Sequence, residues 1–129
     1  MSGRTRISSG SPWESRIGYS RAVKVGDHVW VSGTTGTHPD GTVPEGAIAQ
    51  TRVALGVIQR ALGDAGAAMG DVVAVRAYLV DITEWDAVGS CLGEKFGEVR
   101  PALVMVQVAV LTSPEHRVEI EVEAVIGSA

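Results

Sequence analysis

The sequence predicts an α+β fold in which helices cover one face of a mixed β-sheet. Short segments of alternating apolar and polar residues are typical of strands, and two longer segments repeat their apolar residues at the helical period. The expected order of elements is β-β-α-β-α-β-β, a pattern that favours a two-layer sandwich. At 129 residues, the chain is long enough for one domain with one core.

The first predicted elements form a β-hairpin. Residues 21–25 read as a short strand, and residues 28–33 read as its partner. Gly26 and Asp27 lie between these strands and supply the turn. Residues 34–45 are rich in proline, glycine and aspartate, so we expect a loop there.

Two helices are predicted. Residues 46–66 place apolar side chains near the helical period, and Gly66 is suited to end that helix. The second helix begins with Thr83 as its expected N-cap and acidic residues in its first turn. It continues to about residue 96 or 98, where glycine and proline follow.

Three further strands are expected at residues 71–81, 102–110 and 118–125. The first two are apolar on both faces, so a single copy would leave an apolar face exposed, and a closed homo-oligomer is the common solution. The last strand alternates apolar residues with three glutamates. Arg76 lies within the first of these strands, and we predict that it either pairs with one of these glutamates, the favoured alternative, or points into a ligand cleft.

Composition excludes some classes of function. The net charge is −4 and the basic residues are scattered, so we expect no nucleic acid partner. We also expect no membrane segment, because no apolar stretch approaches the length of about 20 residues that a helix needs to span a bilayer.

The three histidines show no metal-ligand spacing, so no metal is expected. The single cysteine, Cys91, is expected to be a buried, inert thiol in a reduced, cytoplasmic protein.

The chain divides into two parts by its pattern. Residues 1–14 are expected to form a flexible N-terminal arm, because their first ten residues are polar and basic without the apolar core of a secretion signal. Residues 15–127 are expected to form the single domain.

Several motifs, in their order along the chain, resemble those of the RidA/YjgF family of small enamine and imine deaminases. The segments that carry the resemblance are Ile-Gly-Tyr-Ser-Arg-Ala-Val-Lys at 17–24, Val-Ser-Gly-Thr at 31–34, Gln-Thr-Arg at 50–52, Val-Asp-Ile at 80–82, Phe-Gly-Glu-Val-Arg-Pro-Ala at 96–102 and Glu-Ile-Glu-Val-Glu-Ala at 119–124. The resemblance covers about residues 15–126.

The resemblance implies a chorismate-mutase-like fold, a homotrimeric barrel and small-molecule clefts between subunits. The implied family reaction is hydrolysis of reactive 2-enamine or 2-imino acids to 2-keto acids and ammonia, without a cofactor. Glu121 matches the glutamate that handles water and protons. The implied substrate-binding positions are Tyr19, Ser32, Gly33, Thr34 and Leu103.

Leu103 departs from the family pattern, since it stands where an arginine binds the substrate's carboxylate. Arginine binds a carboxylate through two parallel hydrogen bonds, and leucine offers only apolar contact. Three interpretations therefore stay open. The protein is a deaminase-type hydrolase of a neutral or differently anchored C–N compound, a non-enzymatic small-molecule-binding or regulatory trimer, or an RNA-directed protein, the last disfavoured by the acidic balance.

Overall fold

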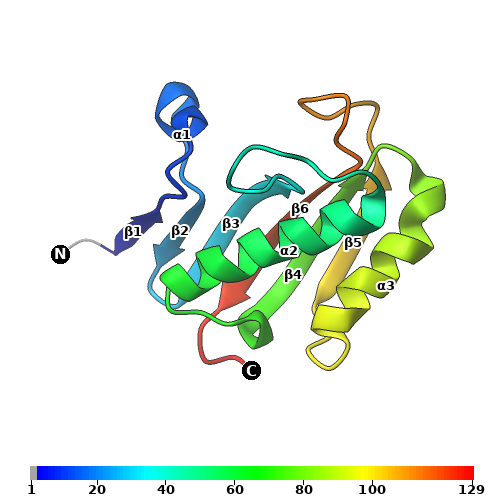
Figure 1. The fold of residues 1–129 in the computed structure, drawn as a ribbon. Helices are drawn as coiled ribbons and strands as arrows, with labels where there is room; N and C mark the ends of the chain where they lie inside the picture. Colours follow the sequence, from blue (N-terminus) through cyan, green and yellow to red (C-terminus); the bar gives the residue numbers. More distant parts are fainter. Residues whose placement is uncertain (1–2) are drawn as a thin grey trace.

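The computed structural model describes residues 3–129 and contains one six-stranded sheet with helices on one side (Figure 1). The strands are β1 (Arg4–Ile7), β2 (Ala22–Val25), β3 (His28–Thr35), β4 (Val72–Leu79), β5 (Ala102–Gln107) and β6 (Val118–Val125). The helices are α1 (Pro12–Ile17), α2 (Ala47–Asp64) and α3 (Trp85–Phe96), with short 3₁₀ turns η1 (Met69–Asp71) and η2 (Ile82–Glu84).

The strand order is β1-β2-β3-β6-β4-β5, and only the β4–β5 pair among these neighbours is parallel. Helices α2 and α3 lie side by side across the same face of the sheet (Figure 1). The predicted α+β class and the order of elements from β2 to β6 are confirmed. The opposite face of the sheet carries no helix of the described chain (Figure 1).

The core fills the space between this sheet and the two long helices. Leu55, Ile58 and Leu62 of α2 are fully buried at helical spacing, whereas Ile48 near the start of the same helix is exposed. They belong to one cluster with the inward-facing apolar residues of the central strands, including Val75 and Val122. Burial of this face gives α2 its stability, because isolated helices of this length are marginal in water.

The N-terminal segment differs from the expected arm. Residues Arg4–Ile7 form β1, which pairs antiparallel with β2. Helix α1 follows, and its Glu14 accepts hydrogen bonds from Ser9 N at 3.1 Å and Ser8 Oγ at 2.8 Å. Burial acts to raise the pKa of Glu14, but the hydrogen bonds from Ser9 and Ser8 leave this pKa below its usual value. A four-residue strand with a single inward apolar residue, Ile7, has no sequence pattern that reveals it.

The start of the second helix also differs. Thr83 was the expected N-cap, but the carboxylate of Asp81 accepts a hydrogen bond from Thr83 N at 3.0 Å and caps the turn η2. Helix α3 begins only at Trp85. Asp81 caps the turn in place of Thr83 because its carboxylate reaches the backbone N–H two residues ahead, as aspartate does in turns.

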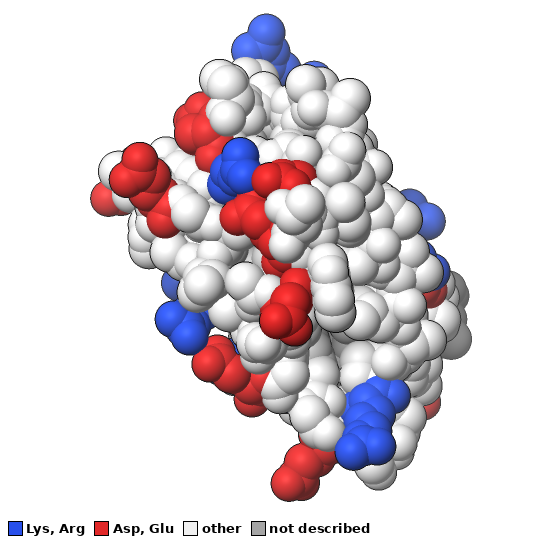
Figure 2. Space-filling model, turned by 90° about the vertical axis from the view of Figure 1, so that its right-hand side faces the viewer, with Lys and Arg blue, Asp and Glu red and all other residues white. Residues whose placement is uncertain are grey.

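Strand β5 forms an exposed edge. It ends at Gln107, short of the predicted residue 110. Leu103 is 51% exposed and Val104 is 52% exposed, and Val106 and Val110 are also exposed. Figure 2, which looks onto the side of the molecule with α3 and β5, shows a broad area without charged side chains. An uncovered apolar surface is therefore present at β5, one of the two strands for which the sequence predicted it.

No helix among residues 3–129 is both long and apolar enough to cross a membrane.

The side chain of Gln50, only 1% exposed, joins α2 to two loops. Its Nε2 donates to the carbonyls of Pro44 at 2.9 Å and Glu115 at 2.8 Å, and its Oε1 accepts from Arg117 N at 2.7 Å. Gly36 packs directly on Gln50, where an added Cβ would lie 2.5 Å from the Gln50 backbone. This amide therefore fixes the loop before α2 and the loop before β6 together.

We predict that Gln50→Met lowers the free energy of unfolding by about 3 kcal/mol, because it removes the three part-buried hydrogen bonds of the Gln50 amide and leaves three backbone groups without that partner. Gln59→Met is the matched control, since Gln59 lies exposed on the same helix, and we expect a change within about 0.5 kcal/mol. Urea denaturation measures both. Equal stabilities of the two variants would contradict the assignment.

Candidate functional site

The glutamates of β6 lie on the face of the sheet that the helices leave open. Val118, Ile120 and Val122 are buried against the helices, so the intervening glutamates point the other way. Arg76 of β4 lies opposite Glu121 in the β4–β6 register. The open face of the two central strands is thus a ladder of charged and polar side chains.

Arg76 pairs with a glutamate of the last strand, as the sequence predicted. Its Nη2 lies 2.8 Å from Glu123 Oε2. The hydrogen bond from Arg76 lowers the pKa of Glu123, although partial burial opposes the shift. This pair leaves the neighbouring Glu121 to a different partner.

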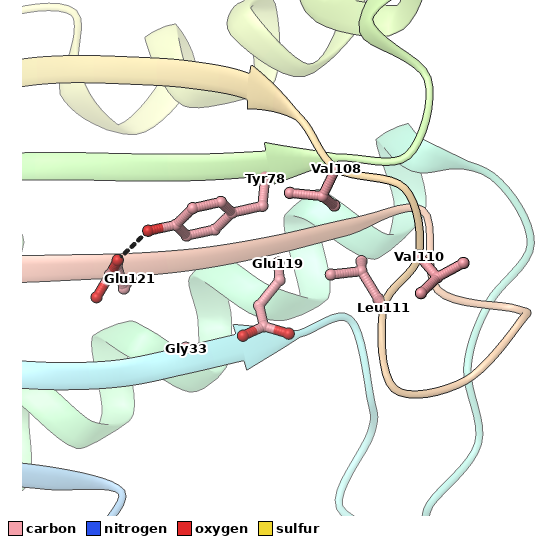
Figure 3. Close-up of a pocket in the computed structure, with 7 residues that line it drawn as sticks. All are labelled: Gly33, Tyr78, Val108, Val110, Leu111, Glu119 and Glu121. Carbon is pink, nitrogen blue, oxygen red and sulfur yellow. Dashed lines mark hydrogen bonds between the residues drawn. The ribbon is translucent and has the colours of Figure 1, made fainter.

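That partner is Tyr78, a residue the sequence analysis missed. The Tyr78 hydroxyl donates a short hydrogen bond to Glu121 Oε1 (Figure 3). This hydrogen bond, with some burial and the nearby carboxylate charge, raises the pKa of Tyr78 above its usual value. The available signal was its position two residues after Arg76, which places both side chains on one face of a strand.

Ser32 and Gly33 form a β-bulge opposite Glu121. Val31 pairs with Val122 and Thr34 pairs with Ile120, so two residues of β3 face one residue of β6. Bulges of this kind often lie beside active sites, where they re-aim side chains.

Two hydroxyl groups hold the bulge in place. The Ser32 hydroxyl donates to the carbonyl of Ser20 at 2.7 Å, and the Thr34 hydroxyl donates to the carbonyl of Ser32 at 2.8 Å. Thr34 is 2% exposed and does not line the pocket. Both hydroxyls therefore support the backbone near Glu121.

Gly33 is needed for its lack of a side chain. An added Cβ would lie 2.2 Å from Oε2 of Glu119, so the carboxylate occupies the space that a side chain would take. The Gly33 carbonyl accepts a hydrogen bond from Arg21 Nη2 at 2.7 Å. Close approach of a carboxylate to the bulge thus depends on glycine at this position.

A pocket of about 330 Å³ opens beside these groups (Figure 3). Its walls combine two carboxylates and a phenol with apolar side chains from the segment that follows β5 (Figure 3). The lining residues are Gly33, Tyr78, Val108, Val110, Leu111, Glu119 and Glu121. Among residues 3–129, no group of three His, Cys, Asp or Glu side chains is placed to hold a metal ion.

The structure does not bring all predicted site residues together. Leu103 pairs with Val75 in the parallel β4–β5 register, so its side chain projects toward the helix side of the sheet. Glu121 projects toward the open side, so Leu103 and Glu121 of one chain do not share a pocket. Tyr19 lies in the segment between α1 and β2, with the Arg21 guanidinium 5.9 Å from its ring centre, and it does not line the pocket.

Cys91 lies buried within α3, as predicted, and does not line the pocket. Burial raises the pKa of its thiol above the usual value.

A family model described as endoribonuclease L-PSP matches residues 11–126 of the chain. A crystal structure of Rv2704 from Mycobacterium tuberculosis, described as a member of the YjgF/YER057c/UK114 family, superposes with a TM-score of 0.89 at 47% identity. That match covers 95% of this chain and 99% of the other. The chain belongs to the YjgF/RidA family.

Two related proteins have names that state an activity. The 2-iminobutanoate/2-iminopropanoate deaminase of Capra hircus is 36% identical over 125 residues, which cover 95% of this chain and 90% of that protein. The 3-aminoacrylate deaminase RutC of Acinetobacter baylyi is 35% identical over 104 residues, or 79% of this chain and 82% of that one. This YjgF/RidA chain is thus similar to deaminases of imines and enamines.

We predict that Glu121→Gln lowers the pKa of Tyr78. With Glu121 ionised, loss of the Tyr78 proton breaks a charge-assisted hydrogen bond and places two negative charges together, and the substitution removes both effects. Ultraviolet titration of tyrosinate measures the shift, and Tyr78→Phe identifies which of the two tyrosines gives the signal. An unchanged Tyr78 titration in Glu121→Gln would show that the hydrogen bond does not persist in solution.

Proposed function

We propose that the protein hydrolyses a small imine or enamine to a carbonyl compound and ammonia, with Glu121 as its catalytic residue. The observation that supports this most is the position of Glu121, which lines the pocket opposite the Ser32–Gly33 bulge and is held by Tyr78. A carboxylate oriented by a hydrogen bond at the wall of a pocket is suited to move protons to and from water.

The proposed reaction uses Glu121 twice. An enamine first takes a proton at carbon from water and releases one from nitrogen to water, and so becomes an imine. Water then forms a bond to the imine carbon while Glu121 accepts one of its protons, and Glu121 passes that proton to nitrogen. The hydroxyl proton then moves to nitrogen as the C–N bond breaks and the carbonyl forms, and ammonia leaves. Tyr78 acts as a positioning residue, because its hydrogen bond fixes the Glu121 carboxylate. No step requires a cofactor.

We further propose that the protein is a homotrimer with its ligand clefts between subunits. The exposed apolar edge at β5 supports this, since an isolated chain would leave it in water. The opposite orientations of Leu103 and Glu121 also support it, because only a second copy can place a Leu103 near this pocket. Tyr19 is partly exposed and does not line the pocket of its own chain, so it would contact a ligand in the pocket of a neighbouring subunit.

Leu103 disfavours a substrate that is anchored by its carboxylate. A hydrogen bond to a charged group contributes about 1.5–3 kcal/mol, so leucine in place of arginine weakens imino-acid binding by about ten- to a hundredfold. The substrate is therefore an imine or enamine held by other contacts.

A second candidate function, binding of a small molecule without turnover, is favoured by this same leucine. A ligand that raises the melting temperature but is not converted would support it, because binding to the native state stabilises that state. The family description as an endoribonuclease has less support here, since the pocket carries two carboxylates, which repel a phosphate backbone.

We predict that Glu121→Gln lowers kcat for imine hydrolysis by about 10²–10⁴-fold, the usual contribution of a general acid–base residue. The assay follows ammonia release from 2-iminopropanoate and from an imine without a carboxylate, each above the uncatalysed rate. Glu45→Gln is the matched control, because Glu45 is exposed and does not line the pocket. Identical rates of the wild type and Glu121→Gln on both imines would overturn the proposed activity.

We also predict that Val104→Asp dissociates the trimer, because it places a charge within an apolar interface. Ile48→Asp is the control, since Ile48 is also an exposed apolar residue but lies on α2, which packs on β3, β6 and α3. Sedimentation equilibrium should give three chain masses for the wild type and the control and one for Val104→Asp. A single chain mass for the wild type would contradict the assembly.

A further inference from the structure

Glu119 is a pocket carboxylate that the proposed hydrolysis leaves unused. It lines the pocket beside Glu121, and its Oε2 lies against the Gly33 backbone. Within residues 3–129, the Glu119 carboxylate makes no hydrogen bond or ion pair with another side chain, whereas Glu121 is bound by Tyr78 and Glu123 by Arg76 and His28. Glu119 therefore keeps its full capacity to accept hydrogen bonds from a ligand.

The other pocket walls supply no positive charge. Val108, Val110 and Leu111 are apolar, and the Tyr78 hydroxyl already donates to Glu121. No lysine, arginine or histidine is among the described residues that line the pocket. Arg21 attracts Glu119 at longer range, but its Nη2 is engaged by the Gly33 carbonyl. The pocket thus offers negative charge at one wall and an apolar surface at the other.

These walls match one kind of imine better than others. A carboxylate on the substrate would meet two like charges and, in the proposed assembly, the neutral Leu103. A protonated imine has a positive charge and N–H donors, and both suit the free acceptor oxygens of Glu119. A small alkyl group fits the surface formed by the valines and the leucine.

We propose that the substrate is a cationic iminium with a small apolar substituent and no carboxylate, and that Glu119 binds its nitrogen. This inference rests on the proposed hydrolysis and names its substrate class. Glu119 is a substrate-binding residue here, and Glu121 remains the residue that moves protons.

The reaction balances for this substrate class. The iminium R₂C=NH₂⁺ and one water give the carbonyl compound R₂C=O and NH₄⁺. Water oxygen bonds to carbon, one water proton reaches nitrogen through Glu121, and the electrons of the C–N bond leave with nitrogen. The second water proton leaves the hydroxyl as the carbonyl forms and also ends on nitrogen. The uncharged carbonyl product no longer pairs with Glu119, which favours its release.

Three matched probes test the charge preference by calorimetry on the assembled protein. 3-Methylbutylammonium is leucine without its carboxylate, 4-methylpentanoate is leucine without its amine, and leucine itself carries both groups. We expect the ammonium to bind at least about tenfold more tightly than either of the others, and Glu119→Gln to weaken it by about tenfold. Glu45→Gln, with the same loss of charge away from the pocket, should leave its affinity unchanged.

Turnover separates this inference from the proposed function. An amine oxidase makes the iminium from 3-methylbutylamine, and an amino-acid oxidase makes the matching imino acid from leucine. We expect the wild type to prefer the first by at least about tenfold in kcat/KM. Preference for the imino acid, or ammonium binding that survives Glu119→Gln, would overturn the cationic substrate and leave the hydrolysis standing. Tight ammonium binding without turnover of either imine would overturn the hydrolysis and leave the cation preference.

Discussion

The alternation of side chains along β6 is the constraint on which the rest of the structure depends. Val118, Ile120 and Val122 must face the helices, because they complete the core with α2, and this forces every intervening glutamate onto the open face. A shift of one residue in register would bury three carboxylates and expose the core. The hydrophobic core therefore fixes the position of the catalytic candidate, Glu121, although Glu121 contributes nothing to that core.

Three equivalent positions on one strand acquire three different environments from their neighbours. Arg76 neutralises Glu123, Tyr78 orients Glu121, and the bulge at Gly33 brings the backbone close to Glu119. These partners lie on strands that are distant in sequence and adjacent in the sheet. The glutamates themselves are identical, so the difference between the ion-paired Glu123, the hydrogen-bonded Glu121 and Glu119, which has no side-chain partner among residues 3–129, comes from strand order.

Features that follow from hydrophobic periodicity and from charge could be predicted from the sequence. Helix α2, the three central strands and the pairing of Arg76 with the last strand follow from apolar spacing and from the high energy of an unpaired charge in a strand. Strand β1 could not be predicted, because its stability comes from pairing with β2. The role of Tyr78 could not be predicted either, because it depends on which strand lies beside β6. The pocket wall at residues 108–111 was also missed, because a loop's position depends on tertiary packing that no local pattern records.

The parallel pairing of β4 with β5 has a consequence for how this site changes its chemistry. Leu103 follows Val75 onto the helix side of the sheet, so it is free of the contacts that hold Glu121, Tyr78 and the bulge. A residue at this position can alternate between arginine and leucine with little effect on the fold of its own chain, because it is exposed there. In the proposed assembly the same residue faces a neighbour's carboxylates. Substrate selection and proton transfer are then carried by different copies of the chain, and the first can vary while the second is preserved.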